Sequence, residues 1–571
     1  MKERNLCFYN KNIARILALI LTIVLIATSG ISIEAARSST KGGVSSYNQS
    51  GQNYNTWSSP MSSYLYVNED GTLTRVEKVD GKIIYEEYDK NYKLINKGSI
   101  KMELDKFGGF YAGKDANYLV FGQNNKEEDK KCEVFRVVKY TKDWKREKSC
   151  GLKDCNTTVP FYAGSLRFAE SGNMLYIRTA HEMYKSSDGY NHQANLTMSV
   201  NTSTMTITDS YSNVMNVGVG YVSHSFNQFI QVNGEELLAV DHGDAYPRSV
   251  VLIKYDQPAG KTTFTGSCSY IDLLEFPGEI GQNSTGGSIG GFEVSKSSYI
   301  VAGNYANTDS SVRNIFISVT PQGELIDGNT NLKYLTKYKK NSNVVVSTPQ
   351  LVKIDNNKLM VLWETTDKKS EINQVNYVMI DGEGKTQTEV RTMRGYLSDC
   401  QPIVYNNNMV WYYTCNSAPI FCSIPTDGSA AEDNTIVGEE YTIGNITYIV
   451  SKSTSNTKTV AVKNIKNNKE TTITIPATIT IKGEKFKVTE VKDYAFENCY
   501  NAKKIVFGSN ITKIGNISMP YWNKVKTIVI NGTELKEVKK QVFQYLTDSA
   551  TIIVPKSKLS AYKKPVSYTH L

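Results

Sequence analysis

Histidines and acidic residues gather in one stretch of this 571-residue chain, and no other stretch suggests chemistry as clearly. Four of the five histidines lie between positions 181 and 242. Two are in the segment AHEMYKSSDGYNHQAN, one is in AVDHGDAYPRS, and His224 lies between the two segments. We take the following residues as candidates for a functional site: His181, His192, His224, His242, Asp241, Asp244, Arg248, Tyr184 and Tyr246.

Two chemical interpretations of this stretch stay open. Imidazole and carboxylate groups that converge can bind a divalent metal, and His181, His242 and Asp241 are the candidate ligands. A histidine beside Asp241 or Asp244 can also act as a general base, with Arg248 holding an anionic substrate. The second interpretation predicts a lyase, hydrolase or transferase that acts on an anionic extracellular polysaccharide. No catalytic residue is assigned on this basis.

The same stretch also has two interpretations without chemistry. Tyr184, Tyr246 and Arg248 are of the types that contact a bound protein or glycan. Alternatively, the polar groups hold long loops together, since ordered loops must satisfy their backbone hydrogen bonds. We expect a binding protein rather than an enzyme, with no cofactor required.

The elements that carry these residues follow from a repeated phrase, an apolar strand preceded by small or polar residues. Its spacing of about 50 to 60 residues, with every unit all-β, is typical of propeller blades. The sequence therefore predicts a mainly β protein with a β-propeller of about seven blades over residues 61–428; six or eight blades stay open. The seven strands open at Tyr64, Tyr118, Leu175, Leu237, Tyr299, Leu359 and Met409.

A propeller would make neighbours of candidates that are far apart in the chain. Strands headed by small residues precede the apolar strands, so we expect each apolar strand to be the second of its blade. The loop after it would then lie on one shared face. His181 and His192 are expected in one such loop, and Asp241, His242 and Asp244 in the next.

The two ends of the predicted propeller carry further expectations. His224 lies near the start of an innermost strand, close to the axis. The last blade lacks an evident fourth strand, which the N-terminal segment could supply to close the ring. Residues 36–60 are rich in Ser, Gly and Asn and are expected to form a flexible lead-in.

The N-terminus has the pattern of a secretory signal peptide over residues 1–35. An apolar run, 16–27, is too short for a comfortable membrane span and precedes small residues near position 35. We expect a protein that is secreted or held at the cell surface, with association with the cell wall an open alternative. The positive residues before the run are Lys2, Arg4, Lys11 and Arg15.

The charge distribution and the cysteines further narrow the class of protein. The formal net charge is +9, but the positive residues are scattered and no nucleic-acid-binding motif is present, so no nucleic-acid partner is expected. Export permits disulfides without requiring them. Cys415 with Cys422, and Cys150 with Cys155, could form disulfides or stay as free thiols.

A different domain is expected at residues 440–564, after a linker at 429–439. Its later part repeats with a period of about 23 residues, which aligns Val491, Ile514 and Val538, and separately Ile505, Ile528 and Ile552. Three stretches of this domain resemble BspA-like leucine-rich repeats of bacterial surface proteins. They are IPATITIKGEKFKVTEV (475–491), YAFENCYNAKKIVFGSNITKIG (494–515) and IIVPKSKLSAYKK (552–564).

The resemblance implies an adhesion or protein-binding module and no catalysis. The segment Met519–Trp522 departs from the repeat pattern. Residues 565–571, PVSYTHL, fit nothing before them and are expected to be a translated sequencing adapter. The sequence thus predicts an exported bacterial binding or adhesion protein that recognises an extracellular protein or glycan.

Overall fold

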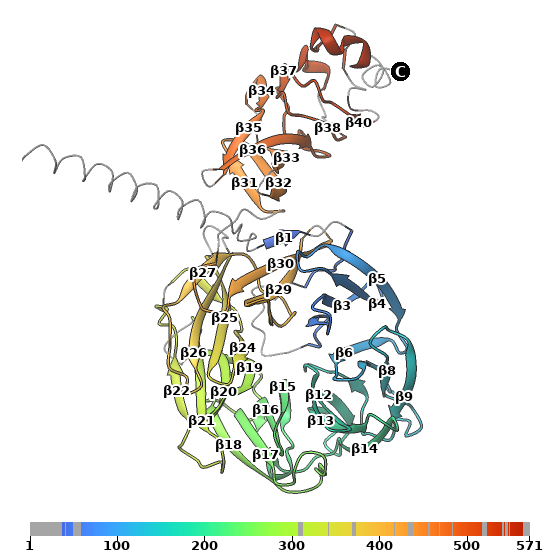
Figure 1. The fold of residues 1–571 in the computed structure, drawn as a ribbon, viewed down its shortest axis with the longest axis vertical. Helices are drawn as coiled ribbons and strands as arrows, with labels where there is room; N and C mark the ends of the chain where they lie inside the picture. Colours follow the sequence, from blue (N-terminus) through green and yellow to red (C-terminus); the bar gives the residue numbers. More distant parts are fainter. Residues whose placement is uncertain are drawn as a thin grey trace, which may run out of the picture.

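The chain is mainly β in the computed structural model (Figure 1). The expected signal peptide and residues 565–571 lie outside the part that the structure describes. In that part, no helix combines the length and the apolar character needed to cross a bilayer. The described residues are 37–39, 42–48, 59–306, 312–340, 342–367, 373–415, 417–431, 438–454, 457–466, 469–481, 484–516, 522–539, 542, 546–547 and 549–562.

Strands up to residue 425 form six antiparallel sheets, one of which has nine strands. The nine-stranded sheet consists of two parts, β10–β14 and β15–β18, which are joined through the single pair Ala194 and Ser223. We describe these two parts as the third and fourth sheets, which gives seven successive sheets. The first contains β2 (Ser63–Val67), β3 (Leu73–Val79), β4 (Lys82–Tyr88) and β5 (Leu94–Lys101). The second contains β6 (Lys106–Ala112), β7 (Asn117–Gly122), β8 (Phe135–Tyr140) and β9 (Arg146–Leu152). The third contains β10 (Val159–Pro160), β11 (Arg167–Ser171), β12 (Met174–Lys185), β13 (Asn191–Asn201) and β14 (Thr206–Tyr211).

The remaining four sheets follow the short 3-10 helix η1 (Val217–Val219). The fourth contains β15 (Ser223–Asn233), β16 (Glu236–Tyr246), β17 (Ser249–Tyr255) and β18 (Cys268–Glu275). The fifth contains β19 (Gly287–Val294), β20 (Ser298–Tyr305), β21 (Asn314–Pro321) and β22 (Asn331–Tyr334). The sixth contains β23 (Val344–Val346), β24 (Gln350–Asp355), β25 (Lys358–Asp367), β26 (Asn373–Asp381) and β27 (Arg391–Arg394).

The N-terminal segment completes the seventh sheet, as the sequence allows. This sheet contains β28 (Ile403–Tyr405), β29 (Asn408–Cys415), β30 (Ala418–Pro425) and β1 (Arg37–Ser39). Strand β1 pairs antiparallel with β30, with Ser38 opposite Phe421. Farther along, the Ser45 hydroxyl is within 2.7 Å of both Glu77 Oε2 and Thr414 Oγ1. The expected lead-in at 36–60 is therefore part of the fold where the structure describes it.

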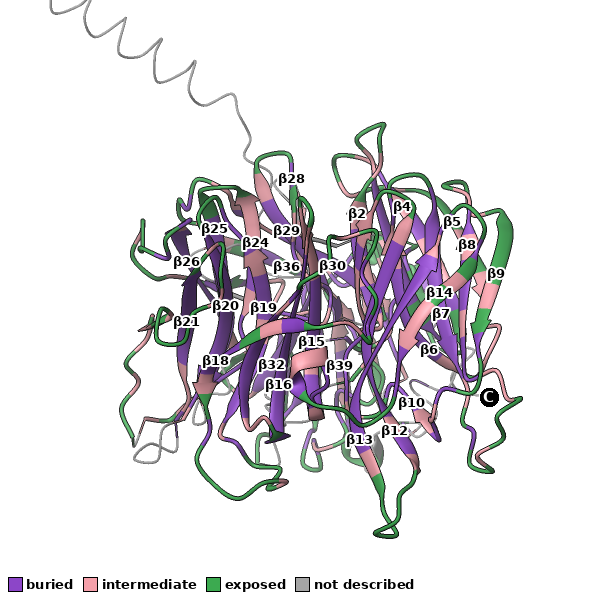
Figure 2. Ribbon diagram, turned by 90° about the horizontal axis from the view of Figure 1, so that it is seen from below, coloured by how far each residue is buried: buried purple, intermediate pink, exposed green. Residues whose placement is uncertain are grey.

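The seven sheets follow one another around a ring in Figure 1. Seven apolar clusters lie between successive sheets, and one of them joins the seventh sheet to the first. Every residue of β7 and of β20 is buried, whereas most of β9 is exposed (Figure 2). A strand buried on both faces needs an unbroken apolar sequence, which explains why these strands stand out as apolar runs.

One of the seven apolar phrases has a different place from the predicted one. The phrase at Tyr64 is β2, the first strand of its sheet, and the second strand is β3. Strand β3 escapes a search for apolar runs because it contains Arg75 and Glu77, which are both buried. The two side chains form an ion pair, and Arg75 also pairs with Glu86. The other six phrases are second strands, as predicted.

The cysteines of the described residues are free thiols. In the hairpin of β29 and β30, Cys415 lies opposite Ala418, and Cys422 lies opposite Trp411, so the two thiols do not face each other. Burial raises the pKa of Cys150 to about 12 and that of Cys155 to about 11. The alternative of disulfides at these two pairs is not observed.

The C-terminal strands begin at Glu440 and form two further sheets. One contains β31 (Glu440–Ile443), β32 (Ile446–Thr454), β33 (Thr457–Ile465), β35 (Thr478–Ile481), β36 (Glu484–Val491), β38 (Lys513–Ile514) and β40 (Glu537–Val538). The other contains β34 (Thr472–Ile475), β37 (Lys504–Phe507), β39 (Thr527–Ile530) and β41 (Thr551–Ile553). The short helices η2 (Trp522–Lys524) and η3 (Lys556–Lys558) complete this part.

Parallel pairing confirms the alignment of the repeats. Val491 pairs with Ile514, which pairs with Val538. In the second sheet Ile505 pairs with Ile528, which pairs with Ile552. Each repeat therefore adds one short strand to each sheet, and the aligned apolar residues form one continuous core. Met519–Tyr521 of the irregular segment lie outside the described residues.

Candidate functional site

The predicted candidates lie in a histidine region, which we define as residues 178–248 of the third and fourth sheets. None of the five residues predicted in two loops lies in a loop, because the strands are longer than expected: His181 is in β12, His192 is in β13, and Asp241, His242 and Asp244 are in β16. We consider first the two histidines in β12 and β16, His181 and His242. Both side chains are fully buried. His181 Nδ1 is 2.7 Å from Thr157 Oγ1, and His242 Nε2 is 2.9 Å from Thr285 Oγ1.

Burial decides the protonation of these two imidazoles. It lowers the pKa of His181 to about 3, because the charged form would lose its hydration. It lowers the pKa of His242 to about 3 as well, with smaller contributions from Arg313 and Arg248. Both rings are therefore neutral at physiological pH and have no access to a ligand from solution.

Asp241 is occupied by an ion pair that the sequence did not indicate. Arg178 Nε donates to Asp241 Oδ2 at 2.8 Å, and the Ser225 hydroxyl donates to Asp241 Oδ1 at 2.7 Å. Arg178 and Asp241 are both fully buried, and they join β12 of the third sheet to β16 of the fourth. Within the described part of the chain, no three His, Cys, Asp or Glu side chains are grouped so as to hold a metal ion.

The other two histidines are brought together at the surface. The rings of His192 and His224 lie 6.5 Å apart between centroids and 28° from parallel. His192 Nε2 is 2.7 Å from Asp188 Oδ2, and His224 Nδ1 is 2.9 Å from Asp244 Oδ1. The side chains of His192 and His224 are 38% and 26% exposed. His224 also has a φ of +50°, a conformation that non-glycine residues rarely adopt.

The remaining candidates differ in how much of the side chain is free. Arg248 donates to four backbone carbonyl groups, those of Asp244, Pro277, Gln282 and Ser284. The Tyr184 hydroxyl accepts a hydrogen bond of 2.9 Å from Asn125 Nδ2. Tyr246 is 52% exposed. Arg248 thus holds the chain segment after β18 in place, and Tyr246 remains accessible.

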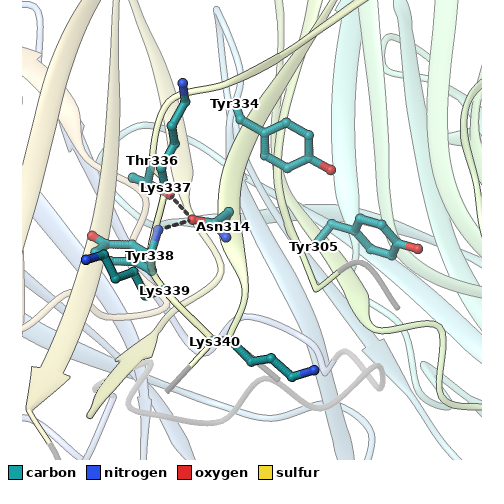
Figure 3. A pocket seen from close by; sticks show the side chains of 8 residues that line it. All are labelled: Tyr305, Asn314, Tyr334, Thr336, Lys337, Tyr338, Lys339 and Lys340. Atoms are coloured by element: carbon teal, nitrogen blue, oxygen red, sulfur yellow. Dashed lines mark hydrogen bonds between the residues drawn. The ribbon is translucent and has the colours of Figure 1, made fainter. Parts of the chain in front are cut away.

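A second region, which sequence reasoning missed, lies at one end of the fifth sheet. We call it the tyrosine–lysine pocket; its cavity volume is about 380 Å³ (Figure 3). It is formed where β20 and β22 end and where β21 begins, together with the segment that follows β22. Its lining residues are Tyr305, Asn314, Tyr334, Thr336, Lys337, Tyr338, Lys339 and Lys340.

Hydrogen bonds fix the segment that carries the lysines. Asn314 Oδ1 accepts from the Thr336 hydroxyl at 3.1 Å and from the Tyr338 amide at 2.6 Å (Figure 3). Trp363 Nε1 of the sixth sheet donates to the Tyr338 hydroxyl at 3.1 Å. The segment is therefore anchored to two neighbouring sheets through every second residue.

The charged lining of the pocket is positive. Lys337, Lys339 and Lys340 are all exposed, and no carboxylate is among the described lining residues. Burial, followed by the neighbouring Tyr305, raises the pKa of Tyr334. The signal that could have found the pocket is the alternation of Lys and Tyr in KYLTKYKK, residues 333–340.

Comparison with known proteins gives a family only for the C-terminal part. Residues 466–569 match the BspA type leucine-rich repeat region, in six copies. No curated protein matches the chain. The mainly β, repeat-containing C-terminal part is thus a BspA-type region, whereas the family of the seven sheets is not given by sequence.

Two solved structures are similar to parts of the chain. A leucine-rich cell surface protein from Faecalibacterium prausnitzii A2-165 is 24% identical, with a TM-score of 0.17 and 21% of this chain covered. A structure from a study of two prolyl endopeptidases is 9% identical, with a TM-score of 0.40 and 73% of this chain covered. The chain spans 34% of the first structure and 55% of the second.

Proposed function

We propose that this chain is an exported bacterial protein, secreted or held at the cell surface, that binds an extracellular protein or glycan. The observation that carries the proposal is the BspA-type leucine-rich repeat region at residues 466–569. Stacked repeats form an extended and rigid surface, which suits binding better than catalysis. The positively charged and apolar N-terminal segment, residues 1–35, supports export.

We further assign the ring of sheets to the β-propeller class, with seven blades. Two observations support this assignment: an apolar cluster lies between every two successive sheets, and β1 completes the last sheet from the other end of the ring. Such a ring carries loops and sheet edges on a rigid support, as binding sites require.

Export is tested by comparing the full chain with a version that begins at residue 36, both produced in bacterial cells. Fractionation and added protease then show where each version is. The full chain is expected outside the cytoplasmic membrane and the shortened version inside the cell. Retention of both versions in the cytoplasm would contradict the proposal.

Binding is tested with the purified chain lacking residues 1–35, on an array of extracellular matrix proteins and of neutral and acidic glycans. At least one protein or glycan class is expected to retain the chain at micromolar concentrations. Heat-denatured chain serves as the control for nonspecific adhesion. If no protein or glycan class on the array retained the chain, the proposed binding function would be excluded.

One observation favours a second candidate function, an enzyme that acts on an anionic extracellular polysaccharide. His224 Nδ1 is 2.9 Å from Asp244 Oδ1, and the described residues make no hydrogen bond to His224 Nε2. An imidazole oriented in this way by a carboxylate can accept a proton at Nε2. Release of sugar products from acidic polysaccharides by the wild type, and its loss in His224→Ala, would establish this function. Equal product release by the variant would exclude His224 as the base.

A further inference from the structure

The tyrosine–lysine pocket has the size of a site for a small ligand. Its volume of about 380 Å³ lies within the range of about 300–1,000 Å³ that is usual for ligand sites. It shares no residue with the histidine region. Its lining combines tyrosine rings, one amide and three ammonium groups, so both apolar and polar contacts are available.

The positive charge of the lining residues favours a negatively charged ligand. Lys337, Lys339 and Lys340 point in different directions around the pocket (Figure 3), so its rim carries separate positive charges. Lys337 and Lys339 take part in no ion pair with the described residues. An anion at the rim of the pocket can therefore accept a charge-assisted hydrogen bond from either of these two lysines.

The segment that carries these lysines is ordered before any ligand binds. Thr336 and Tyr338 are hydrogen-bonded to Asn314, and Trp363 holds the Tyr338 hydroxyl. Leu335 N also donates to Ile315 O at 2.8 Å. A ligand therefore has to order only the lysine side chains and not the backbone, which lowers the entropy lost on binding.

The tyrosines add a surface for flat, partly apolar groups. Tyr305 and Tyr334 lie on one side of Asn314, opposite Tyr338 and Lys339 (Figure 3). Tyr334 is 41% exposed, and its ring rests edge-on against Phe316, with the centroids 6.3 Å apart. A tyrosine ring offers an apolar face and a hydroxyl tip, which matches a sugar ring with its C–H face and its hydroxyl groups.

We propose that the tyrosine–lysine pocket binds an acidic saccharide, a sugar that carries carboxylate or sulfate groups. Lys337 and Lys339 bind the anionic groups, and Tyr334 packs against the sugar ring. This assignment rests on the proposed function, since it names the ligand class of an extracellular binding protein. An acidic peptide and a nucleic acid share the negative charge but not the sugar face, and they serve as competitors in the test.

Calorimetric titration of the chain without residues 1–35 tests the ligand class. The probes are a galacturonic acid trimer, a sulfated heparin trisaccharide and a neutral galactose trimer. At least one acidic trimer is expected to bind and the neutral one not, with binding weakening from about 50 mM to about 500 mM NaCl because salt screens exposed charges. The acidic trimer that binds identifies carboxylate or sulfate as the recognised group. Equal binding of the neutral trimer, or stronger binding of a glutamate peptide or an oligonucleotide, would overturn the proposal.

Variants then locate the site. Lys337→Gln combined with Lys339→Gln is expected to weaken binding about tenfold, because each exposed ion pair contributes modestly and two are lost. Tyr334→Ala is expected to weaken binding without changing its salt dependence. The matched control is Lys145→Gln combined with Lys148→Gln, which removes the same charge from exposed positions at the outer edge of the second sheet. An equal loss in this control would mean that only the total charge matters, and the pocket would be excluded. Thermal melting verifies that each variant is folded.

The outcomes separate this inference from the proposed function. If another glycan or a protein binds on the array while acidic trimers do not, the pocket assignment fails and the binding function stands. If the acidic trimers bind but the chain is not exported, the pocket stands and the surface function fails.

Discussion

The histidine region and the tyrosine–lysine pocket use polar residues for opposite purposes. In the histidine region, His181, His242 and Asp241 are buried, and the two histidines at the surface are each within hydrogen-bonding distance of a carboxylate. In the pocket, ordinary lysines and tyrosines are held at the surface by Asn314 and Trp363. The exposure of a side chain and the absence of a protein partner, more than its intrinsic reactivity, therefore decide whether it can contact a ligand.

The largest expected effect is the loss of the buried ion pair. Arg178→Met should destabilise the fold by about 3–5 kcal/mol, because Asp241 would remain as a buried charge without its partner. Urea unfolding at neutral pH measures the change. Arg178→Met combined with Asp241→Leu is the matched control and should cost clearly less than the sum of the two single changes. A small effect of Arg178→Met alone would contradict the structural role given to this region.

Acid sensitivity is expected next in size. The pKa of His242 is about 3 in the folded chain and about 6.5 in the unfolded chain, so the unfolded state binds protons first as pH falls. Stability is therefore complete above about pH 6.5 and is lost towards pH 3, by about 1.4 kcal/mol per pH unit for each such histidine. Unfolding curves at about pH 7.5 and about pH 5 should differ less in His242→Gln than in the wild type, by about 2 kcal/mol.

His181 gives an independent test of the same point, because burial lowers its pKa to about 3 as well. His181→Gln should reduce the pH dependence by a similar amount, and Lys337→Gln should not reduce it. If His242→Gln and His181→Gln kept the full wild-type pH dependence, the two imidazoles would not be buried and neutral.

Arg248→Ala is expected to have a moderate effect. Arg248 donates to the carbonyl groups of Asp244, Pro277 and Gln282 at 2.7–3.1 Å, and its loss leaves these groups to water. We expect a destabilisation of about 1–2 kcal/mol, since each hydrogen bond contributes little net stability where solvent can replace it. Binding of acidic trimers should persist. Loss of binding with unchanged stability would instead make Arg248 a ligand residue.

The smallest expected effect on stability is in the pocket. Lys337→Gln and Lys339→Gln should each change the free energy of unfolding by less than about 0.5 kcal/mol, as is usual for exposed positions without partners. The same denaturant curves measure both variants. A larger loss would show that these lysines support the fold, and the contrast between the two regions would disappear.

Much of the fold could be predicted because it depends on local pattern. Six of the seven apolar phrases are second strands, and the repeats of the C-terminal part pair in the predicted register. The phrase at Tyr64 is the first strand of its sheet and not the second. The second strand, β3, was not predicted because it contains Arg75 and Glu77, which are buried and form an ion pair. Charged residues within a strand usually indicate exposure to solvent. The sequence of β3 therefore resembles that of an exposed strand, although its charged residues form a buried ion pair.

The candidate site could be predicted only in part, for a related reason. The sequence brought His192, His224 and Asp244 to one neighbourhood, and the structure places them there. It could not separate them from His181 and His242, which have similar sequence surroundings and lie inside. Nor did it indicate the pocket, whose lining comes from the ends of three strands and the segment after β22.

The sequence by itself determined the β class of this protein, the repetition of its sheets and the register of its C-terminal repeats. Unbroken apolar runs and a regular period act locally, through strand burial and stacking. Only the tertiary structure decided which polar groups are available. Arg178 and Asp241 are 63 residues apart in the chain and meet because two sheets pack face to face. Availability depends on such distant contacts, which no local pattern records.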